Sequence, residues 1–232
     1  MPPEAREPDE RADRLSAGLA EATGNAAFVL ALRERGVRDT AVLRAMEQVP
    51  RERFAPPALR PHARRDIALP LACGQTMTAP SVVAQMLGAL DLAPGQRVLE
   101  VGTGTGYVTA LLVRLGAAHV RSLERYEGLA RAARAHLGPD LADVTVETHD
   151  GLAPEVVRGG SYDRILVNGS LAALPPHLPA ALKSGGRLVA GHWTGRGSRL
   201  VTLTRDSAAA YARTEGAALR LGPLTPGRAL GS

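Results

Sequence analysis

Apolar and polar residues follow two different patterns along this chain of 232 residues. Before about residue 92, apolar positions recur at the three- and four-residue spacing of helices. From Gln96 onward, short apolar segments with a β-strand pattern alternate with helical ones. Because such alternation is typical of a parallel sheet flanked by helices, we expect an open, doubly wound α/β sheet preceded by an N-terminal helical segment.

The N-terminal half predicts short helices. Residues 1–24 are rich in charge, Pro and Ala and predict a flexible tail or a short helix through 12–22. Further helices are expected over 26–36, which Gly36 ends, over 38–49, with Asp39 as N-cap, and over 79–92, with a proline in its first turn.

The remaining chain predicts six strands and three helices. Strands are expected over 97–102, 119–124, 144–149, 163–169, 186–193 and 199–205, and helices over 106–116, 126–137 and 175–185. Gly116 and Gly185 lie where two of these helices should stop. We therefore expect one domain over 25–232, with a helical segment at 25–90 and the sheet core at 91–232.

Composition excludes several kinds of site. Cys73 is the single cysteine, so an intrachain disulfide or a thiolate metal cluster is excluded, and the six histidines show no paired spacing for a metal. The net charge of +5 comes from scattered arginines without interleaved aromatics, so we expect no nucleic-acid partner. No apolar run is long enough to span a bilayer and the start is too charged for a secretory signal, which predicts a cytoplasmic protein, expected to be monomeric.

A glycine motif follows the first predicted strand of the sheet. In "LEVGTGTGY" the glycines Gly102, Gly104 and Gly106 alternate behind Glu100, whereas a dinucleotide fold requires G-x-G-x-x-G. Alternating glycines suit a ligand without a pyrophosphate, and an acidic residue can hold a cationic amino acid group such as that of S-adenosylmethionine. A tight turn without a ligand is the alternative.

Two more acidic residues end the next two strands. Glu124, in "SLER", can accept hydrogen bonds from both hydroxyls of a ribose, and Asp150 with Gly151, in "THDG", lies where an adenine amine could be recognised. Strand ends of a parallel sheet share one edge, so these residues should meet. A simple turn cap is the alternative for Asp150.

Three further segments carry a family resemblance. The chain resembles the protein-L-isoaspartate O-methyltransferase family from about Phe28 to "GPLTPG". The resemblance lies in the motifs, and in the order, of the segments "VLRAMEQVPRERFAPPAL", "DIALPLACGQTMTAPSVVAQML" and "RVLEVGTGTGYVTALLVRL". The resemblance implies a Rossmann-like mixed sheet of the class I methyltransferases. It implies methyl transfer from S-adenosyl-L-methionine, with S-adenosyl-L-homocysteine as product, to isoaspartyl carboxylates of damaged proteins or peptides.

The same resemblance assigns roles to individual residues. Thr78, in "CGQTMTAP", matches the active-site hydroxyl residue, and a helix N-cap is its alternative role. Cofactor contacts are implied for Gln75, Thr76, Met77, Glu100, Gly102, Gly104, Gly106, Glu124, Asp150, Gly151 and Thr225. Substrate contacts are implied for Val83, Asn168, Ser170 and His192.

Two segments depart from the family pattern. The chain reads "VNGSLAALP" and "AGHW" where the family has an Ala-rich "VTAAAP" and "PVG". His192 and Trp193 could equally lie on the surface. Two alternatives therefore stand beside the repair enzyme: a related methyltransferase acting on another carboxylate, such as Asp in a modified peptide, and an inactive protein that still binds S-adenosylmethionine.

Overall fold

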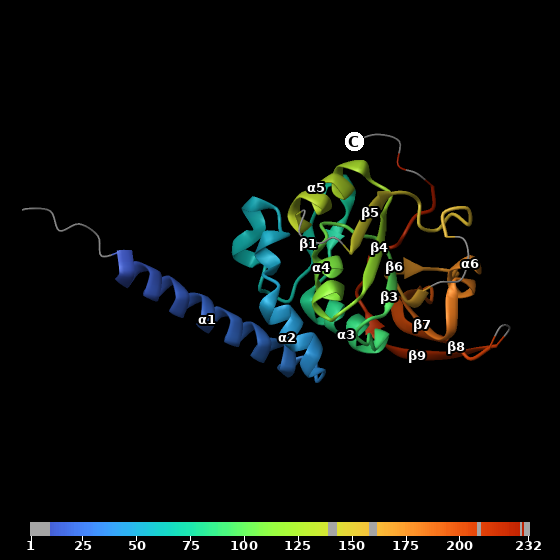
Figure 1. Cartoon of the computed structure of the whole chain (residues 1–232), viewed down its shortest axis with the longest axis horizontal. Helices are drawn as coiled ribbons and strands as arrows, with labels where there is room; N and C mark the ends of the chain where they lie inside the picture. Colours follow the sequence, from blue (N-terminus) through green and yellow to red (C-terminus); the bar gives the residue numbers. More distant parts are fainter. Residues whose placement is uncertain (1–9, 139–142, 158–161, 208–209, 228, 230–232) are drawn as a thin grey trace, which may run out of the picture.

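The computed structural model describes residues 10–138, 143–157, 162–207, 210–227 and 229. A seven-stranded sheet forms its centre, with the strand order β5-β4-β3-β6-β7-β8-β9 (Figure 1). The strands are β3 (Arg97–Val101), β4 (His119–Glu124), β5 (Val144–Thr148), β6 (Tyr162–Leu171), β7 (Leu182–Trp193), β8 (Ser198–Arg205) and β9 (Tyr211–Leu219). β3 to β7 are mutually parallel, and β8 and β9 are added antiparallel. The expected mixed, doubly wound sheet is confirmed.

Helices and short turns complete the fold. The α-helices are α1 (Glu10–Glu34), α2 (Thr40–Gln48), α3 (Pro80–Leu90), α4 (Tyr107–Arg114), α5 (Glu127–Leu137) and α6 (His177–Ala180). Three 3₁₀ turns, η1 (Arg51–Arg53), η2 (Pro57–His62) and η3 (Ala72–Gly74), and a small antiparallel pair, β1 (Leu69–Pro70) with β2 (Thr76–Met77), lie between α2 and α3. None of the described helices is both long enough and apolar enough to cross a membrane.

Side-chain alternation along the strands builds a core on each face of the sheet. Val98 and Leu166 pack in a cluster with residues of α2, α3 and α4, whereas Leu99 and Ile165 pack on the opposite face. Successive strand residues point to opposite faces, so one apolar strand supplies both clusters. Strands buried on both faces favour continuous apolar runs, and residues 165–167 of β6 and 188–190 of β7 have this pattern.

Several local signals have their expected effect. Asp39 caps α2 by accepting from the N–H groups of Ala41 and Val42. Pro80 begins α3, where its missing N–H costs nothing. Gly36 and Gly116 adopt φ angles of 89° and 95° just beyond α1 and α4, in the left-handed region that glycine tolerates.

Two expectations about helices are wrong. The separate helices at 12–22 and 26–36 are one continuous α1, because no proline interrupts it and a helix tolerates Gly18 and Gly24 at moderate cost. The expected boundary between residues 24 and 25 therefore falls inside α1, whose first half extends away from the remaining structure (Figure 1).

The helix expected over 175–185 is only the four-residue α6. Pro179 lies inside it and lacks an N–H donor, and Leu182 already pairs with Tyr162 in the sheet. Gly185, expected as a helix cap, has a φ of 74° inside β7, where the register with β6 is irregular. Strand β9 was not predicted, because eight of its nine residues are not buried and give no apolar alternation.

Candidate functional site

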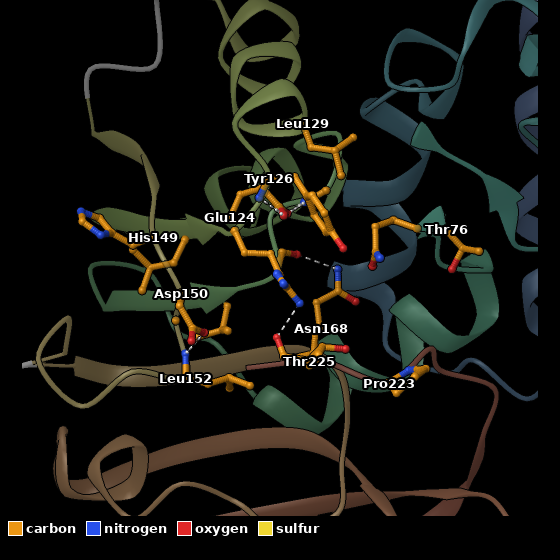
Figure 2. Close-up of a pocket in the computed structure, with 18 residues that line it drawn as sticks. Thr76, Glu124, Tyr126, Leu129, His149, Asp150, Leu152, Asn168, Pro223 and Thr225 are labelled. Atoms are coloured by element: carbon orange, nitrogen blue, oxygen red, sulfur yellow. Dashed lines mark hydrogen bonds between the residues drawn. The ribbon is translucent and has the colours of Figure 1, made fainter. Parts of the chain in front are cut away.

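A cleft lies at the carboxyl edge of the parallel strands, where ligands bind in open α/β sheets. This main cleft encloses about 660 Å³, counted with the solvent at its mouth, and its walls come from the ends of β3, β4 and β6, the turn after β5 and residues 223–225. Figure 2 shows Glu124, Asp150, Asn168 and Thr225 around it, with Thr76 at one side. The sequence prediction that the acidic strand ends meet at this edge is confirmed for Glu124 and Asp150.

The glycine loop, Gly102–Gly106, turns from β3 into α4. All three glycines have positive φ angles, 93° at Gly102, 56° at Gly104 and 89° at Gly106. Gly102 and Gly104 line the main cleft, where the missing side chains let a ligand approach the backbone. Gly106 does not line the cleft but faces α5, where an added Cβ would lie 3.3 Å from Ala133 and Leu137. The third glycine therefore permits helix packing.

Glu124 ends β4 and faces the cleft. Its Oε2 accepts from the N–H of Gly104 at 2.8 Å, and its Oε1 accepts from the N–H of Tyr126 at 3.1 Å. Burial raises the pKa of this carboxyl, and the backbone N–H groups oppose that shift. The carboxylate thus fixes the glycine loop against the end of β4 and still presents lone pairs to a ligand.

Glu100 does not line the cleft, contrary to its expected contact with the cofactor. It shares the sheet face of Val98, beneath α4, because side chains alternate along β3. Its Oε2 accepts from Thr109 of α4 at 2.5 Å and from Ser122 of β4 at 2.6 Å, whereas Oε1 is buried without a described partner. Burial raises the pKa of this carboxyl to about 7.

The third acidic residue, Asp150, binds the backbone on both sides. Its Oδ1 accepts from the N–H of Leu152 at 2.9 Å, and its Oδ2 accepts from the N–H of Gly227 at 2.6 Å. The hydrogen bond to Leu152 is the turn cap that the sequence offered as the alternative role of Asp150. Gly151 is buried against Val101, whose Cγ1 would lie 2.6 Å from an added Cβ. Both residues line the cleft.

A C-terminal strap, residues 222–227, passes over the cleft. Ser170 of β6 holds it through two backbone hydrogen bonds, to the carbonyl of Gly222 and from the N–H of Leu224, both 2.9 Å long. Arg125 donates to the carbonyl of Thr225 at 2.8 Å. The strap brings Thr225 to the wall of the cleft, the position expected for it.

The lip, Cys73–Pro80, borders a second, smaller cavity of about 270 Å³. The small cavity shares Thr76, Gly104 and Asn168 with the main cleft, and Met77, Thr78 and Val83 also line it. Thr78 Oγ1 donates to Asn168 Oδ1 at 3.4 Å. The N-cap position of α3 is Ala79, with no side-chain hydrogen bond, so Thr78 is not a helix cap.

Two residues expected at the substrate lie elsewhere. Ser170 is 3% exposed, and its hydroxyl accepts from Ser198 at 2.7 Å. His192 lies 3.2 Å from Arg213, between Nδ1 and Nη2, on the β7–β9 side of the sheet. Neither lines the main cleft or the small cavity. The registers of β6 and β7 decide this, and the sequence does not show them.

The sequence analysis missed other residues of the cleft wall. Three of them adjoin the acidic strand ends Glu124 and Asp150 in the sequence, and this position could have identified them: Arg125, Tyr126 and His149. Leu129, on α5, and Leu224, on the strap, are apolar residues that only the packing brings to the cleft.

Comparison with known proteins agrees with this geometry. The family model described as protein-L-isoaspartate(D-aspartate) O-methyltransferase matches residues 23–227. The chain belongs to this family. Among curated members, the protein-L-isoaspartate O-methyltransferase of Xanthobacter autotrophicus is 46% identical over 208 residues, 88% of this chain and 92% of the relative. That of Rhodopseudomonas palustris is 43% identical over 201 residues, 86% of this chain and 93% of the relative.

Solved structures share the fold. A Plasmodium falciparum structure described as a protein-L-isoaspartate O-methyltransferase in complex with S-adenosyl-L-homocysteine has a TM-score of 0.74 at 20% identity, over 86% of this chain and 97% of that one. These structures share the Rossmann-like sheet, and the family match makes it the sheet of a class I methyltransferase. The cofactor of this methyltransferase family is S-adenosyl-L-methionine, and the cleft fits it, with two ligand-facing glycines and a strand-end carboxylate in Glu124.

Proposed function

We propose that this protein methylates the free α-carboxylate of L-isoaspartyl residues in damaged proteins or peptides, using S-adenosyl-L-methionine. Membership of the family supports the reaction. The observation that carries the proposal for the site is the small cavity beside the main cleft, where Thr78 of the lip faces Asn168 across from the glycine loop.

The reaction requires positioning rather than proton transfer. The cofactor supplies a methyl group on a positively charged sulfur. An oxygen of the acceptor carboxylate would form a new bond to the methyl carbon while the bond between that carbon and sulfur breaks. The electron pair of the broken bond stays on the sulfur. Because an α-carboxyl has a reference pKa of about 3.5, the acceptor is already ionised at neutral pH. Orientation of the two reactants can supply roughly 7–11 kcal/mol.

The residues divide between the two cavities. We propose that Glu124 binds the ribose hydroxyls, that Asp150 and Gly151 border the adenine, and that Thr225 closes that side. Gly102 and Gly104 would bring their backbone to the amino acid portion of the cofactor, next to Asn168. At the small cavity, the Thr78 hydroxyl and the Val83 side chain would orient the acceptor carboxylate, with Gln75, Thr76 and Met77 forming the wall between the two ligands.

Repair follows from the chemistry of the product. The methyl ester of an isoaspartyl residue is attacked by the following backbone nitrogen, with methanol as leaving group, and gives a succinimide. Hydrolysis of this ring returns part of the material to normal aspartate. Methylation is thus the activating step of repair.

A paired-peptide assay tests the acceptor. Two peptides identical except for Asp or isoAsp are incubated with protein and methyl-labelled cofactor, and label released as methanol after mild base is counted. We expect transfer to the isoAsp peptide. Transfer to the Asp peptide would support the alternative of another carboxylate, and no transfer by protein that binds cofactor calorimetrically would support an inactive relative.

We also propose that residues 25–232 form the catalytic unit and that the protein acts as a cytoplasmic monomer without nucleic acid. The burial of side chains along α1 supports the boundary. Leu19 is exposed, and Phe28 is the first residue of this helix that is buried among those whose side chains the structure describes. Deletion of residues 1–24 should leave turnover unchanged and the protein monomeric by light scattering.

A further inference from the structure

One buried arginine lies directly beneath the lip. Arg51, in η1, is 2% exposed, and all its described hydrogen-bond partners are main-chain carbonyl oxygens. Nη2 donates to the carbonyls of Met77 at 3.2 Å and Thr78 at 2.9 Å, two of the three lip residues that border the small cavity. The same guanidinium donates to Ala63 at 2.6 Å and Ile67 at 3.3 Å in the preceding connection.

These hydrogen bonds provide donors for main-chain carbonyls of the lip. The carbonyls of Met77 and Thr78 accept from a buried guanidinium, and a carbonyl that is shielded from water destabilises the fold when it has no donor. A planar fork with several donors can serve acceptors that are 26 and 27 residues away along the chain. Burial lowers the pKa of Arg51 to about 10, so it stays charged at neutral pH.

The segment that carries Arg51 also contacts the opposite wall. Phe54, directly after η1, packs on Tyr107 with ring centroids 5.6 Å apart, and on His136 at 5.8 Å. Tyr107 lines the small cavity, and His136 Nδ1 lies 3.0 Å from the carbonyl of Thr105 in the glycine loop. Residues 51–54 therefore join the lip to the glycine loop across the small cavity.

We propose that Arg51 is a positioning residue for methyl transfer, which fixes the Thr78 backbone at a set distance from the glycine loop. It contacts neither cavity and acts through the lip. The proposal rests on the proposed function, because it assigns the lip to the acceptor. Loss of the guanidinium should impair turnover more than cofactor binding, since Glu124 and the strap hold their positions without it.

A second buried arginine provides a matched control. Arg164, in β6, is 9% exposed and donates to the main-chain carbonyl of Asp91 at 2.7 and 3.0 Å and to that of Asp163 at 3.0 Å. It lines neither cavity. Replacement of Arg164 also removes a guanidinium that donates only to main-chain carbonyls, so it measures the effect of a general loss of stability.

The experiment compares Arg51→Met, Arg51→Lys and Arg164→Met. With the isoaspartyl peptide, we expect kcat to fall about tenfold or more in Arg51→Met, with cofactor Kd changed less than about threefold, and kcat to stay within about twofold in Arg164→Met. Arg51→Lys keeps the charge without the fork, so we expect an intermediate kcat. Unchanged kcat in Arg51→Met, or an equal loss in Arg164→Met, would overturn the proposal.

Hydrogen–deuterium exchange supplies a readout that does not depend on the acceptor. Amides of residues 69–79 should exchange about tenfold faster in Arg51→Met than in wild type, and at the wild-type rate in Arg164→Met. If wild type transfers no methyl group to the peptide, the proposed function fails while exchange still tests Arg51. If Arg51→Met does not fold, Arg51→Lys decides: wild-type kcat and wild-type exchange of the lip in that variant would refute the proposal.

Discussion

Glu124 and Glu100 are two buried carboxylates in neighbouring strands, and their partners give them different tasks. Glu124 accepts from two backbone N–H groups and faces the main cleft. Glu100 accepts from two hydroxyls beneath α4 and has no contact with the cleft. A carboxylate bound only by backbone at the rim of a cleft can also receive a ligand hydroxyl, which supports Glu124 as the ribose contact.

Replacement of Glu124 by Ala should weaken cofactor binding. The variant removes charge-assisted hydrogen bonds and the partner of the Gly104 N–H, so we expect a loss of roughly 1.5–3 kcal/mol in binding free energy. Calorimetry with S-adenosyl-L-homocysteine measures it. The exposed Glu155→Ala serves as control, and unchanged affinity in Glu124→Ala would place the ribose elsewhere.

Replacement of Thr78 by Val should slow catalysis. The variant keeps the shape of the side chain but removes the hydroxyl that borders the small cavity and donates to Asn168. We expect kcat to fall about tenfold with nearly unchanged cofactor affinity, and Thr78→Ser to retain activity. Single-turnover kinetics with saturating cofactor give the rate, and a normal rate in Thr78→Val would remove Thr78 from the reaction.

At the scale of elements, the strap completes the cleft from a distant part of the chain. Hydrogen bonds from Arg125 to Thr225 and from Gly227 to Asp150 connect it to the ends of β4 and β5. Its approach to β6 depends on Gly169, since a Cβ there would lie 2.8 Å from Cδ2 of Leu224. The strap therefore depends on a missing side chain in β6.

Gly169→Ala should displace the strap and weaken cofactor binding. Leu224 must move away from the new methyl group, and it carries the neighbouring Thr225 with it, so we expect cofactor Kd to rise about tenfold. Gly197→Ala is the control, because nothing lies within 4 Å of its added Cβ. Equal affinity of the two variants would show that the strap does not contribute to binding.

At the scale of the whole molecule, the parallel strands place the functional residues and the antiparallel addition supports them. β3 to β6 end at the cleft, whereas β8 and β9 extend the far side of the sheet (Figure 1). Ser198 of β8 donates to Ser170, which holds the strap. The added strands thus support the site through β6.

The pH dependence of global stability should reflect Glu100. Burial raises its pKa from 4.5 to about 7. Between pH 4.5 and about pH 7, the folded protein therefore keeps a proton on Glu100 that the unfolded chain has released. The stabilisation is full below pH 4.5 and is lost as pH rises through about 7, by up to about 3 kcal/mol. Glu100→Gln should flatten this decline.

Denaturant unfolding at several pH values measures the effect. Wild type and the exposed Glu155→Gln should both lose free energy of unfolding between pH 4.5 and 7, and Glu100→Gln should lose less. An identical decline in all three proteins would contradict a shifted Glu100.

The sequence by itself determined the elements that depend on local chemistry. The period of apolar residues predicts β3 to β8, and the side chain of Asp39 and the ring of Pro80 predict helix starts. The family motifs predict an active-site role for Thr78 and a cofactor contact for Glu124. Local signals suffice there because hydrogen bonding within a turn or alternation along a strand uses neighbours in the chain.

Only the tertiary structure decided the remainder. The packing of α4 on one face of the sheet covers Glu100, and the registers of β6 and β7 separate Ser170 and His192 from the small cavity. Contact with α5 gives Gly106 its role. The mostly exposed β9 forms a strand by pairing with β8, and Arg51 finds its acceptors in segments up to 27 residues away. The physical reason is common to all of these: direction and pairing of a side chain depend on groups that folding brings together, and no local pattern records them.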